Sequence, residues 1–545
     1  DEQAMLGKAF SDHVLDATDS FVHVITDQSE LVGLPEDAIA AAADTAQQKG
    51  LEGWAFTLHF PSYYPVMQYS ENRPLRRLMY EAYVTRASEL APEFSKGKLD
   101  WDNTSNMLEQ LKLRDEEAQM LGFKNYAALS IAPKMASSVE EVDAFLCNFA
   151  QKAKPFALKD WQELSEFAKT ELAIANGLEP WDIAFASERL KQERYSFSEN
   201  ELKQYFPLPK VLDGLFQVIQ TLFGVKIESA DLPTWHADVQ SFSVKNAEGK
   251  IAAYFYLDPY ARPGKRGGAW MDDARGRREL ANGEIQVPAA YLVCNFAPPV
   301  KVDGVLRQPT ITHDDVITLF HESGHGLHHL LTQVSALGVS GINGVEWDAV
   351  ELPSQFMENF CWEWEVLEKM TAHAETGKPL PKDLFDKMLA AKNFQNGYMT
   401  LRQVVMSLTD WRLHASFDAK KAQGHAVLDL SRSIADQFNV IPQPAISRWI
   451  NTFSHIFAGG YAAGYYSYKW AEVLSADVYS AFEEAAKLTG SVLDQRTGVR
   501  YRQEILEVGG SRSAAESFKA FRGREPSIDA LLRHGGLVTQ SEFRL

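Results

Sequence analysis

The sequence predicts a mainly α-helical protein that contains one small β-sheet. Apolar residues recur at spacings of three and four positions between residues 75 and 225, as in helices with one buried face. The same periodicity returns at residue 313 and continues nearly to the C-terminus, and strand-like runs lie between the two stretches. A chain of 545 residues is too long for one compact core. We therefore expect a mainly helical lobe over 1–230, a small β-sheet region over 231–312 and a second helical region over 313–545.

Prolines and short apolar runs mark individual elements within these regions. Pro155, Pro180 and Pro207 interrupt the first helical stretch and are predicted to lie at helix boundaries. The strand-like runs cover residues 56–60, 237–258 and 290–296. The chain opens within an expected helix over residues 2–15, and no basic-then-apolar secretory signal precedes it. We expect that the native start lies upstream and that an N-terminal region is missing.

Composition and charge exclude several classes of protein. Hydrophobic residues make up 45% and charged residues 23%, which is typical of a folded, water-soluble chain. The 54 basic and 73 acidic residues give a formal charge of −19, so we expect neither nucleic acid nor an anionic membrane as a partner. No run approaches the roughly 20 apolar residues of a membrane-spanning helix. The three cysteines, Cys147, Cys294 and Cys361, are too widely separated to suggest disulfides, which favours a reducing, cytoplasmic compartment.

One segment, from Thr312 to His325, carries a metal-binding pattern. Thr312 is the expected N-cap of a helix that has two acidic residues in its first turn. His321 and His325 are four positions apart and share one helical face, so both imidazoles can reach the same metal ion. Glu322 can hydrogen-bond a water at that metal without being a ligand, and zinc lowers the pKa of such a water to about 7. The pattern predicts a zinc site with Glu322 as the general base.

A catalytic zinc also needs a third protein ligand. His328 lies on the same face, but it is about 10.5 Å from His321 along the helix axis, too far for both to bind one ion. The third ligand is therefore expected from another element. Four carboxylates follow a glycine-bearing stretch, and composition does not choose among them, since each is individually typical of a solvated surface acid. They are Glu346 and Asp348 in a loop, Glu351 at the start of a helix whose first turn Pro353 fits, and Glu358 two turns further on.

The segments His321-Glu-Ser-Gly-His325-Gly-Leu-His328 and Glu351-Leu-Pro-Ser-Gln together resemble the M3 (thimet oligopeptidase) family of metallopeptidases, and within it the oligopeptidase A branch. The similarity runs from about Leu15 to the C-terminus. It implies a two-lobed, zincin-type fold with a deep substrate channel, and it implies that Glu351 is the third zinc ligand. Two departures stand out. Ser323 replaces the usual Phe, and an N-terminal helical region that helps to wall the channel in the family is absent.

A second segment, from His455 to Tyr468, is rich in tyrosine. Tyr461, Tyr465 and Tyr468 have helical spacing and are predicted to form one stripe on a helix, behind a flexible pair of glycines. An aromatic core stripe is the structural alternative. The family resemblance implies instead that His455 and Tyr468 donate hydrogen bonds to the transition state, with Tyr461 and Tyr465 beside the substrate backbone. A further candidate is Arg502, which could meet the terminal carboxylate of a peptide.

The expected function is zinc-dependent hydrolysis of short, unstructured peptides by a monomer with one zinc ion. An extended peptide would enter the channel and pair with an edge strand of the sheet over 237–296. Glu322 would take a proton from the attacking water, and Tyr468 and His455 would stabilise the oxyanion. One alternative is a peptidyl-dipeptidase of the same family, which releases C-terminal dipeptides. The other is a non-catalytic peptide-binding scaffold with a structural zinc.

Overall fold

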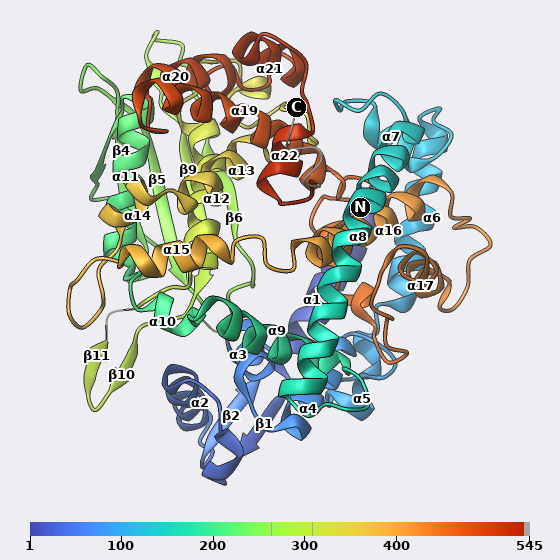
Figure 1. Ribbon diagram of the computed structural model, residues 1–545. Coiled ribbons are helices and arrows are strands. Elements are labelled where there is room, and N and C mark those ends of the chain that lie inside the picture. The colour runs from blue at the N-terminus through green and yellow to red at the C-terminus, as the bar shows by residue number, and fades with distance from the viewer. Residues whose placement is uncertain (263, 308, 539–545) are drawn as a thin grey trace. The chain divides into compact units, whose positions relative to one another are not determined.

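A computed structural model describes residues 1–262, 264–307 and 309–538 of the chain. The chain divides into two compact units, and each unit is built from stretches that are far apart in the sequence. Unit 1 comprises Asp1–Ala132, Ala136–Ser196 and Asn393–Tyr466, and unit 2 comprises Pro133–Met135, Phe197–Lys392 and Ser467–Leu545. Figure 1 shows this mixing by colour. The predicted boundary at residue 312 directly precedes a helix that starts at His313, whereas the boundary at residue 230 falls after the first strand of a sheet, Lys226–Ser229. The division into three functional regions remains a prediction.

Unit 1 is almost entirely helical, with one two-stranded antiparallel sheet formed by β1 (Val22–Ile25) and β2 (Trp54–Thr57). The strand-like run at 56–60 corresponds to the end of β2. Its α-helices are α1 (Glu2–Asp19), α2 (Glu36–Gln48), α3 (Phe60–Tyr69), α4 (Arg73–Val84), α5 (Ala91–Phe94), α6 (Thr104–Met120), α7 (Tyr126–Ile131), α8 (Val139–Glu171), α9 (Pro180–Tyr195), α16 (Asn396–Ala415), α17 (Ala426–Phe438) and α18 (Ser454–Phe457).

The prediction that Pro155 ends a helix is wrong, because Pro155 lies inside α8. An internal proline costs about 3 kcal/mol, so other contacts must offset it. Helix α16 packs against α8, and Gly397 allows the two backbones to approach closely beside Phe156 and Ala157. The carboxylate of Asp160, also on α8, accepts a hydrogen bond from the backbone N–H of Tyr398 at 3.0 Å. Pro180 and Pro207 do lie at helix starts, as predicted.

Unit 2 combines a five-stranded sheet with helices from two parts of the chain. Its α-helices are α10 (Glu199–Lys203), α11 (Leu208–Phe223), α12 (His313–Leu330), α13 (Leu352–Glu358), α14 (Trp364–Met370), α15 (Lys382–Ala390), α19 (Ser467–Thr489), α20 (Gln495–Tyr501), α21 (Ala514–Arg522) and α22 (Asp529–His534). Its strands are β3 (Lys226–Ser229), β4 (Gln240–Lys245), β5 (Ile251–Tyr260), β6 (Trp270–Arg275), β7 (Arg278–Glu279), β8 (Ile285–Gln286), β9 (Ala289–Phe296), β10 (Val300–Val302) and β11 (Val305–Arg307).

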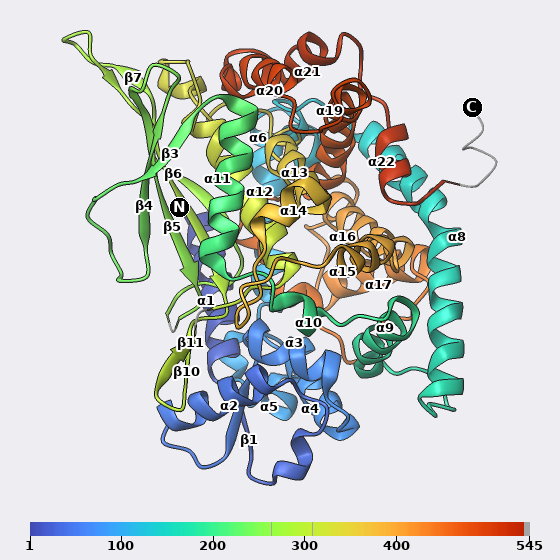
Figure 2. The same ribbon diagram turned by 60° about the vertical axis from the view of Figure 1, so that its left-hand side comes forward.

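The strand order of the five-stranded sheet is β3-β4-β5-β9-β6. Only the β5–β9 pair is parallel, and β6 lies at one edge, antiparallel to β9. Helices α11 and α12 lie on one face of the sheet, as Figure 2 shows. Phe216 of α11 packs against Phe242 and Phe255, and Gly326 of α12 lies against Leu292 of β9. Helix α12, which carries the metal-binding pattern, therefore packs directly on this sheet.

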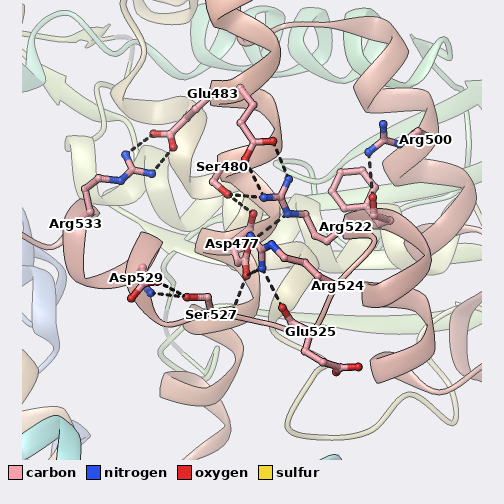
Figure 3. A network of polar contacts seen from close by, with 12 residues as sticks. Asp477, Ser480, Glu483, Arg500, Arg522, Arg524, Glu525, Ser527, Asp529 and Arg533 are labelled. Atoms are coloured by element: carbon pink, nitrogen blue, oxygen red, sulfur yellow. Dashed lines mark hydrogen bonds and ion pairs between the residues drawn. The ribbon is translucent and has the colours of Figure 1, made fainter. Parts of the chain in front are cut away.

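A buried ionic network fixes α19 to the C-terminal segment. Figure 3 shows Asp477 of α19 in contact with Arg522, Arg524 and Ser527. The Asp477 side chain is almost completely buried, and Arg524 approaches it with two nitrogens, each at 2.7 Å. Burial alone would raise the pKa of the Asp477 carboxyl, but the two guanidinium groups and the Ser527 N–H hold that pKa below its usual value.

Within the described part of the chain, no helix is long and apolar enough to cross a membrane.

Candidate metal centre and active site

Helix α12 begins where the sequence predicts, immediately after Thr312. The Thr312 hydroxyl accepts a hydrogen bond from the Asp315 N–H at 3.0 Å, and the Asp315 carboxylate accepts one from the Thr312 N–H at 3.0 Å. This reciprocal capping box satisfies two backbone donors that a helix start leaves unpaired. The predicted N-cap is confirmed, and it fixes the register in which His321 and His325 emerge one turn apart.

The third side chain that converges with His321 and His325 is that of Glu351, the N-cap residue of α13. Its Oε2 atom lies 3.1 Å from Nε2 of His321 and 3.1 Å from Nε2 of His325. The Ser354 hydroxyl donates a hydrogen bond to the same Oε2 at 2.9 Å and so holds the carboxylate in place. Among the described residues, His321, His325 and Glu351 form a group whose possible ligand atoms all lie within 4.8 Å of one another.

The other three carboxylates that the sequence left open have different partners. Glu346 accepts a hydrogen bond from the Ala514 N–H at 2.9 Å, and Asp348 accepts one from the Met135 N–H at 2.9 Å. Glu358 Oε1 lies 2.6 Å from Nδ1 of His321. Glu358 is thus a functional residue whose sequence position alone does not distinguish it from a metal ligand or a surface acid. Its position two turns into α13 was predicted, but its partner depends on how α13 crosses α12.

The Glu358 contact defines the proton position on His321. A carboxylate 2.6 Å from Nδ1 accepts a hydrogen bond, so the Nδ1–H faces Glu358 and the lone pair of Nε2 faces Glu351. Two acceptors at 3.1 Å repel each other unless a cation or a proton lies between them. Ligands at 2.0–2.1 Å from a tetrahedral zinc are separated by about 3.3 Å, which matches the two 3.1 Å distances. The three donors therefore fit zinc.

Glu322 is buried beside this group and is not one of the three converging donors. Its Oε2 atom has no hydrogen-bond partner among the described residues. Burial raises the pKa of the Glu322 carboxyl, and the neighbouring His321 and His325 oppose that rise. A carboxylate with a raised pKa and an unpaired oxygen is suited to take a proton from water and to return it.

Gly324 allows α13 to come close enough for Glu351 to reach the histidines. A Cβ atom at position 324 would lie 2.5 Å from Cα of Ser354, well inside van der Waals contact. The glycine of the H-E-S-G-H pattern is therefore required by the crossing of the two helices. At the neighbouring position, the Ser323 hydroxyl donates to the Leu319 carbonyl at 2.7 Å, so this departure from the usual Phe leaves no unpaired hydroxyl.

Two further histidines follow on α12. His328 is buried, its Nδ1 has no hydrogen-bond partner among the described residues, and burial lowers its pKa to about 3. His329 contacts the backbone carbonyl of Arg275 through Nε2 at 2.9 Å. A carbonyl can only accept, so His329 donates at Nε2. This bond ties the edge strand β6 to the metal helix.

The predicted helical stripe of tyrosines is wrong. Tyr461 and Tyr465 lie in a non-helical turn over 461–466, and only Tyr468 lies on a helix, α19, which begins at Ser467. The physical reason is Ala463, whose φ of +48° is incompatible with a continuous right-handed helix. Tyr461 and Tyr465 belong to unit 1 and Tyr468 to unit 2.

The remaining predicted residues lie as follows. His455 is on α18 in unit 1, and its ring lies 5.8 Å from that of Tyr461 and 5.5 Å from that of Tyr465. Tyr468 is linked to α13 because the Gln355 side chain donates to the Tyr468 carbonyl at 3.0 Å. Arg502 donates to the Phe223 carbonyl and is ion-paired with Glu507, so its predicted role toward a substrate carboxylate remains a prediction.

A helix that carries two histidines one turn apart, joined by a glutamate from the next helix and resting on a small sheet, defines a zincin-type metallopeptidase. The model of "Peptidase family M3" matches residues 66–537 of the sequence. The chain belongs to peptidase family M3 and is a zinc metallopeptidase.

Known proteins with similar sequences support this assignment. The chain is 50% identical over 533 residues to oligopeptidase A of Escherichia coli, which covers 98% of this chain and 76% of that protein. It is 33% identical to dipeptidyl carboxypeptidase of the same organism, over 98% of this chain and 76% of that protein. The solved structure of PZ peptidase A with an inhibitor matches with a TM-score of 0.58 at 16% identity, over 98% of this chain and 75% of that one. This last similarity shows the fold alone.

Proposed function

We propose that the chain is an oligopeptidase that hydrolyses internal bonds of short, unstructured peptides with one zinc ion held by His321, His325 and Glu351. The observation that carries this proposal is that Oε2 of Glu351 lies 3.1 Å from Nε2 of each of the two histidines, beside the buried carboxylate of Glu322. The name of its 50% identical relative, oligopeptidase A, supports the substrate class.

Zinc bound to these residues would polarise the peptide carbonyl and make a water molecule acidic near neutral pH. In this mechanism Glu322 accepts the proton of the attacking water and then gives it to the leaving amine. Glu358 accepts the Nδ1 proton of His321, which leaves the Nε2 lone pair free to bind a metal, and Ser354 restrains the Glu351 carboxylate. We propose that Tyr468 and His455 donate hydrogen bonds to the oxyanion and that Tyr461 and Tyr465 contact the substrate backbone.

The substrate is proposed to bind as an added strand at β6. This strand lies at the edge of its sheet, and Asp272, Asp273 and Arg275 are exposed. An edge strand offers unpaired backbone groups to an extended peptide, and a folded protein cannot present such a strand. The His329 bond to the Arg275 carbonyl fixes β6 relative to α12, so the paired peptide keeps its register with respect to the metal ligands.

The decisive experiment is the Glu322→Gln variant. Glutamine has nearly the same size but cannot accept the proton, so kcat should fall by at least about 10²-fold while zinc content stays stoichiometric. Glu346→Gln is the matched control, because its carboxylate contacts only the Ala514 N–H in the described structure, and its kcat should stay within about twofold of the wild type. Normal turnover of a quenched peptide by zinc-loaded Glu322→Gln would refute the mechanism.

Substrate selection is tested with one peptide sequence presented in three forms. The free peptide should be cut, and the same sequence inside a stable folded domain should not be, because unfolding that domain costs about 5–15 kcal/mol. An amidated C-terminus should leave the cleavage site unchanged. Cleavage that always falls two residues from a free C-terminus would identify a peptidyl-dipeptidase instead.

We also propose that the enzyme acts as a monomer in the cytoplasm, without a nucleic acid or membrane partner. The strong negative charge supports the absence of nucleic acid and anionic membrane partners. The three cysteines, which are free thiols in the structure, support a reducing compartment. Sedimentation of the zinc-loaded protein at micromolar concentration tests the oligomeric state.

A further inference from the structure

The turn that carries Tyr461 and Tyr465 has no regular secondary structure of its own. It follows Gly459 and Gly460, and Gly460 has a φ of +83° that only glycine adopts without cost. Ala463 also has a positive φ, +48°, although its Cβ atom makes this conformation unfavourable. A segment of this kind keeps one conformation only if surrounding groups hold it.

The carboxylate of Asp410 holds this turn. Asp410 lies on α16 and is completely buried. It accepts hydrogen bonds from three successive backbone N–H groups, those of Ala463 at 2.9 Å, Gly464 at 3.0 Å and Tyr465 at 2.9 Å. Successive N–H groups in a turn that contains a left-handed residue form a nest, a concavity that binds anions. Here the anion is a side chain of the same unit.

A chain of buried polar groups extends from Asp410 to the backbone of Ile456, which precedes the turn. The His414 Nδ1 lies 2.8 Å from the Asp410 carbonyl and 3.1 Å from its Oδ1, and Arg114 Nη1 lies 3.0 Å from His414 Nε2. Arginine only donates, so His414 accepts at Nε2 and donates at Nδ1. Arg114 Nη2 donates to the Ile456 carbonyl at 2.8 Å, next to His455. One network therefore contacts the chain both at Ile456, before the turn, and at residues 463–465, within it.

Two more contacts restrain the turn from other directions. The Ser130 hydroxyl donates to the Ala463 carbonyl at 2.8 Å, and the Tyr465 hydroxyl donates to Gln403 Oε1 at 2.9 Å. The Asp410 contacts differ from these because they are charge-assisted and engage three donors at once. Removing that carboxylate would leave buried N–H groups unpaired, which is costly.

We propose that Asp410 is a positioning residue for substrate binding, whose carboxylate fills the backbone nest at residues 463–465 and so fixes Tyr461 and Tyr465 in their substrate-contacting arrangement. This inference rests on the proposed function, which assigns those two tyrosines to the substrate. Asp410 itself is buried beneath the turn and does not touch the peptide.

The test is the Asp410→Asn variant of the full chain. Asparagine offers one oxygen and one NH₂ group, so at least one N–H of the nest loses its acceptor. Loss of a charge-assisted hydrogen bond should speed hydrogen exchange of the 461–466 amides by about 10- to 100-fold. The KM for a short peptide should rise by about the same factor, with zinc content unchanged because the metal ligands belong to the other unit.

Asp182→Asn is the matched control. Asp182 is also fully buried in unit 1, where it pairs with Arg73 and Arg76. This variant should lower the melting temperature without changing KM or the exchange of the 461–466 amides. Ser130→Ala is the milder second variant in case Asp410→Asn does not fold. It removes one neutral hydrogen bond to the turn and should change exchange and KM by about 2- to 10-fold in the same direction.

The outcomes separate this inference from the proposed function. Wild-type protein that cuts no peptide would overturn the proposed function. Wild-type cleavage, together with unchanged exchange and unchanged KM in folded Asp410→Asn, would overturn the positioning role alone. Should Asp410→Asn fail to fold, unchanged exchange and KM in Ser130→Ala would have the same consequence.

Discussion

The substitution Gly324→Ala should disable zinc binding, although position 324 is not a ligand. Gly324 lies between the two metal-binding histidines of α12 and faces the start of α13. The methyl group of alanine would point at the α13 backbone rather than at a side chain that could turn away. Alanine favours helices more than glycine by about 1 kcal/mol, so α12 itself is not weakened.

The displacement follows from the contact distances. A Cβ atom at position 324 would lie 2.3 Å from the Pro353 carbonyl oxygen and 2.5 Å from Cα of Ser354, whereas ordinary van der Waals contact begins at 3.4 Å. The closer contact requires the two helices to separate by about 1.1 Å, the difference between 3.4 and 2.3 Å. Zinc–ligand distances tolerate only about 0.2 Å. Since Glu351 moves with α13, its carboxylate would leave the range of a zinc bond, and zinc affinity should fall by more than the 10- to 100-fold typical of losing an outer hydrogen-bond partner.

The assay is competition for zinc against a chelator of known affinity, with metal content measured by mass spectrometry. Two glycines of unit 2 provide a graded series. A Cβ at Gly338 would meet nothing within 4 Å, so Gly338→Ala should bind zinc normally. A Cβ at Gly326 would lie 3.1 Å from a flexible methyl of Leu292, so Gly326→Ala should have a small effect. If Gly324→Ala held zinc as tightly as Gly338→Ala, the close helix crossing would not be what places Glu351.

Three other substitutions test the site and the fold around it. Glu351→Ala should lose zinc on dialysis against a mild chelator, because it removes a ligand, and stoichiometric zinc after dialysis would contradict the assignment. Glu358→Gln should weaken zinc binding by about 10- to 100-fold, since the amide no longer fixes the His321 tautomer, whereas wild-type affinity would show that the 2.6 Å contact is incidental. Asp477→Ala should destabilise unit 2 by about 3 kcal/mol, because it leaves buried Arg522 without this partner. Thermal unfolding of the Asp477 variant measures that loss, and an unchanged melting temperature would show that the network of Figure 3 is dispensable.

The metal helix could be predicted from the sequence because its determinants are local. The cap at Thr312, the four-residue spacing of His321 and His325 and the position of Glu322 all depend on neighbours within one helix. The start of α13 at Glu351 was also visible, since Pro353 favours a first helical turn. These features need no knowledge of how the chain folds back on itself.

Features that depend on distant partners were not predictable. The helical spacing of Tyr461, Tyr465 and Tyr468 indicated one continuous helix, but three N–H groups of that stretch bond to Asp410, more than fifty positions earlier. Pro155 likewise remains inside α8 because α16 packs on that helix. In both cases tertiary contacts outweigh the local preference that the pattern expresses.

Contacts of α12 that involve no metal ion explain why the ligands alone do not make this site. Gly324 sets the distance to α13, the His321 ring is held from behind by Glu358, and His329 ties the helix to β6. Two of these contacts join α12 to α13 and the third joins it to β6, and together they place Glu351, the proton on His321 and the peptide-binding edge relative to one another. A histidine pair and a glutamate at the right spacing on an isolated helix would satisfy the sequence pattern and none of these constraints. The catalytic geometry is therefore a property of the packed α12, α13 and sheet, which is why a substitution that touches no ligand, Gly324→Ala, is expected to abolish it.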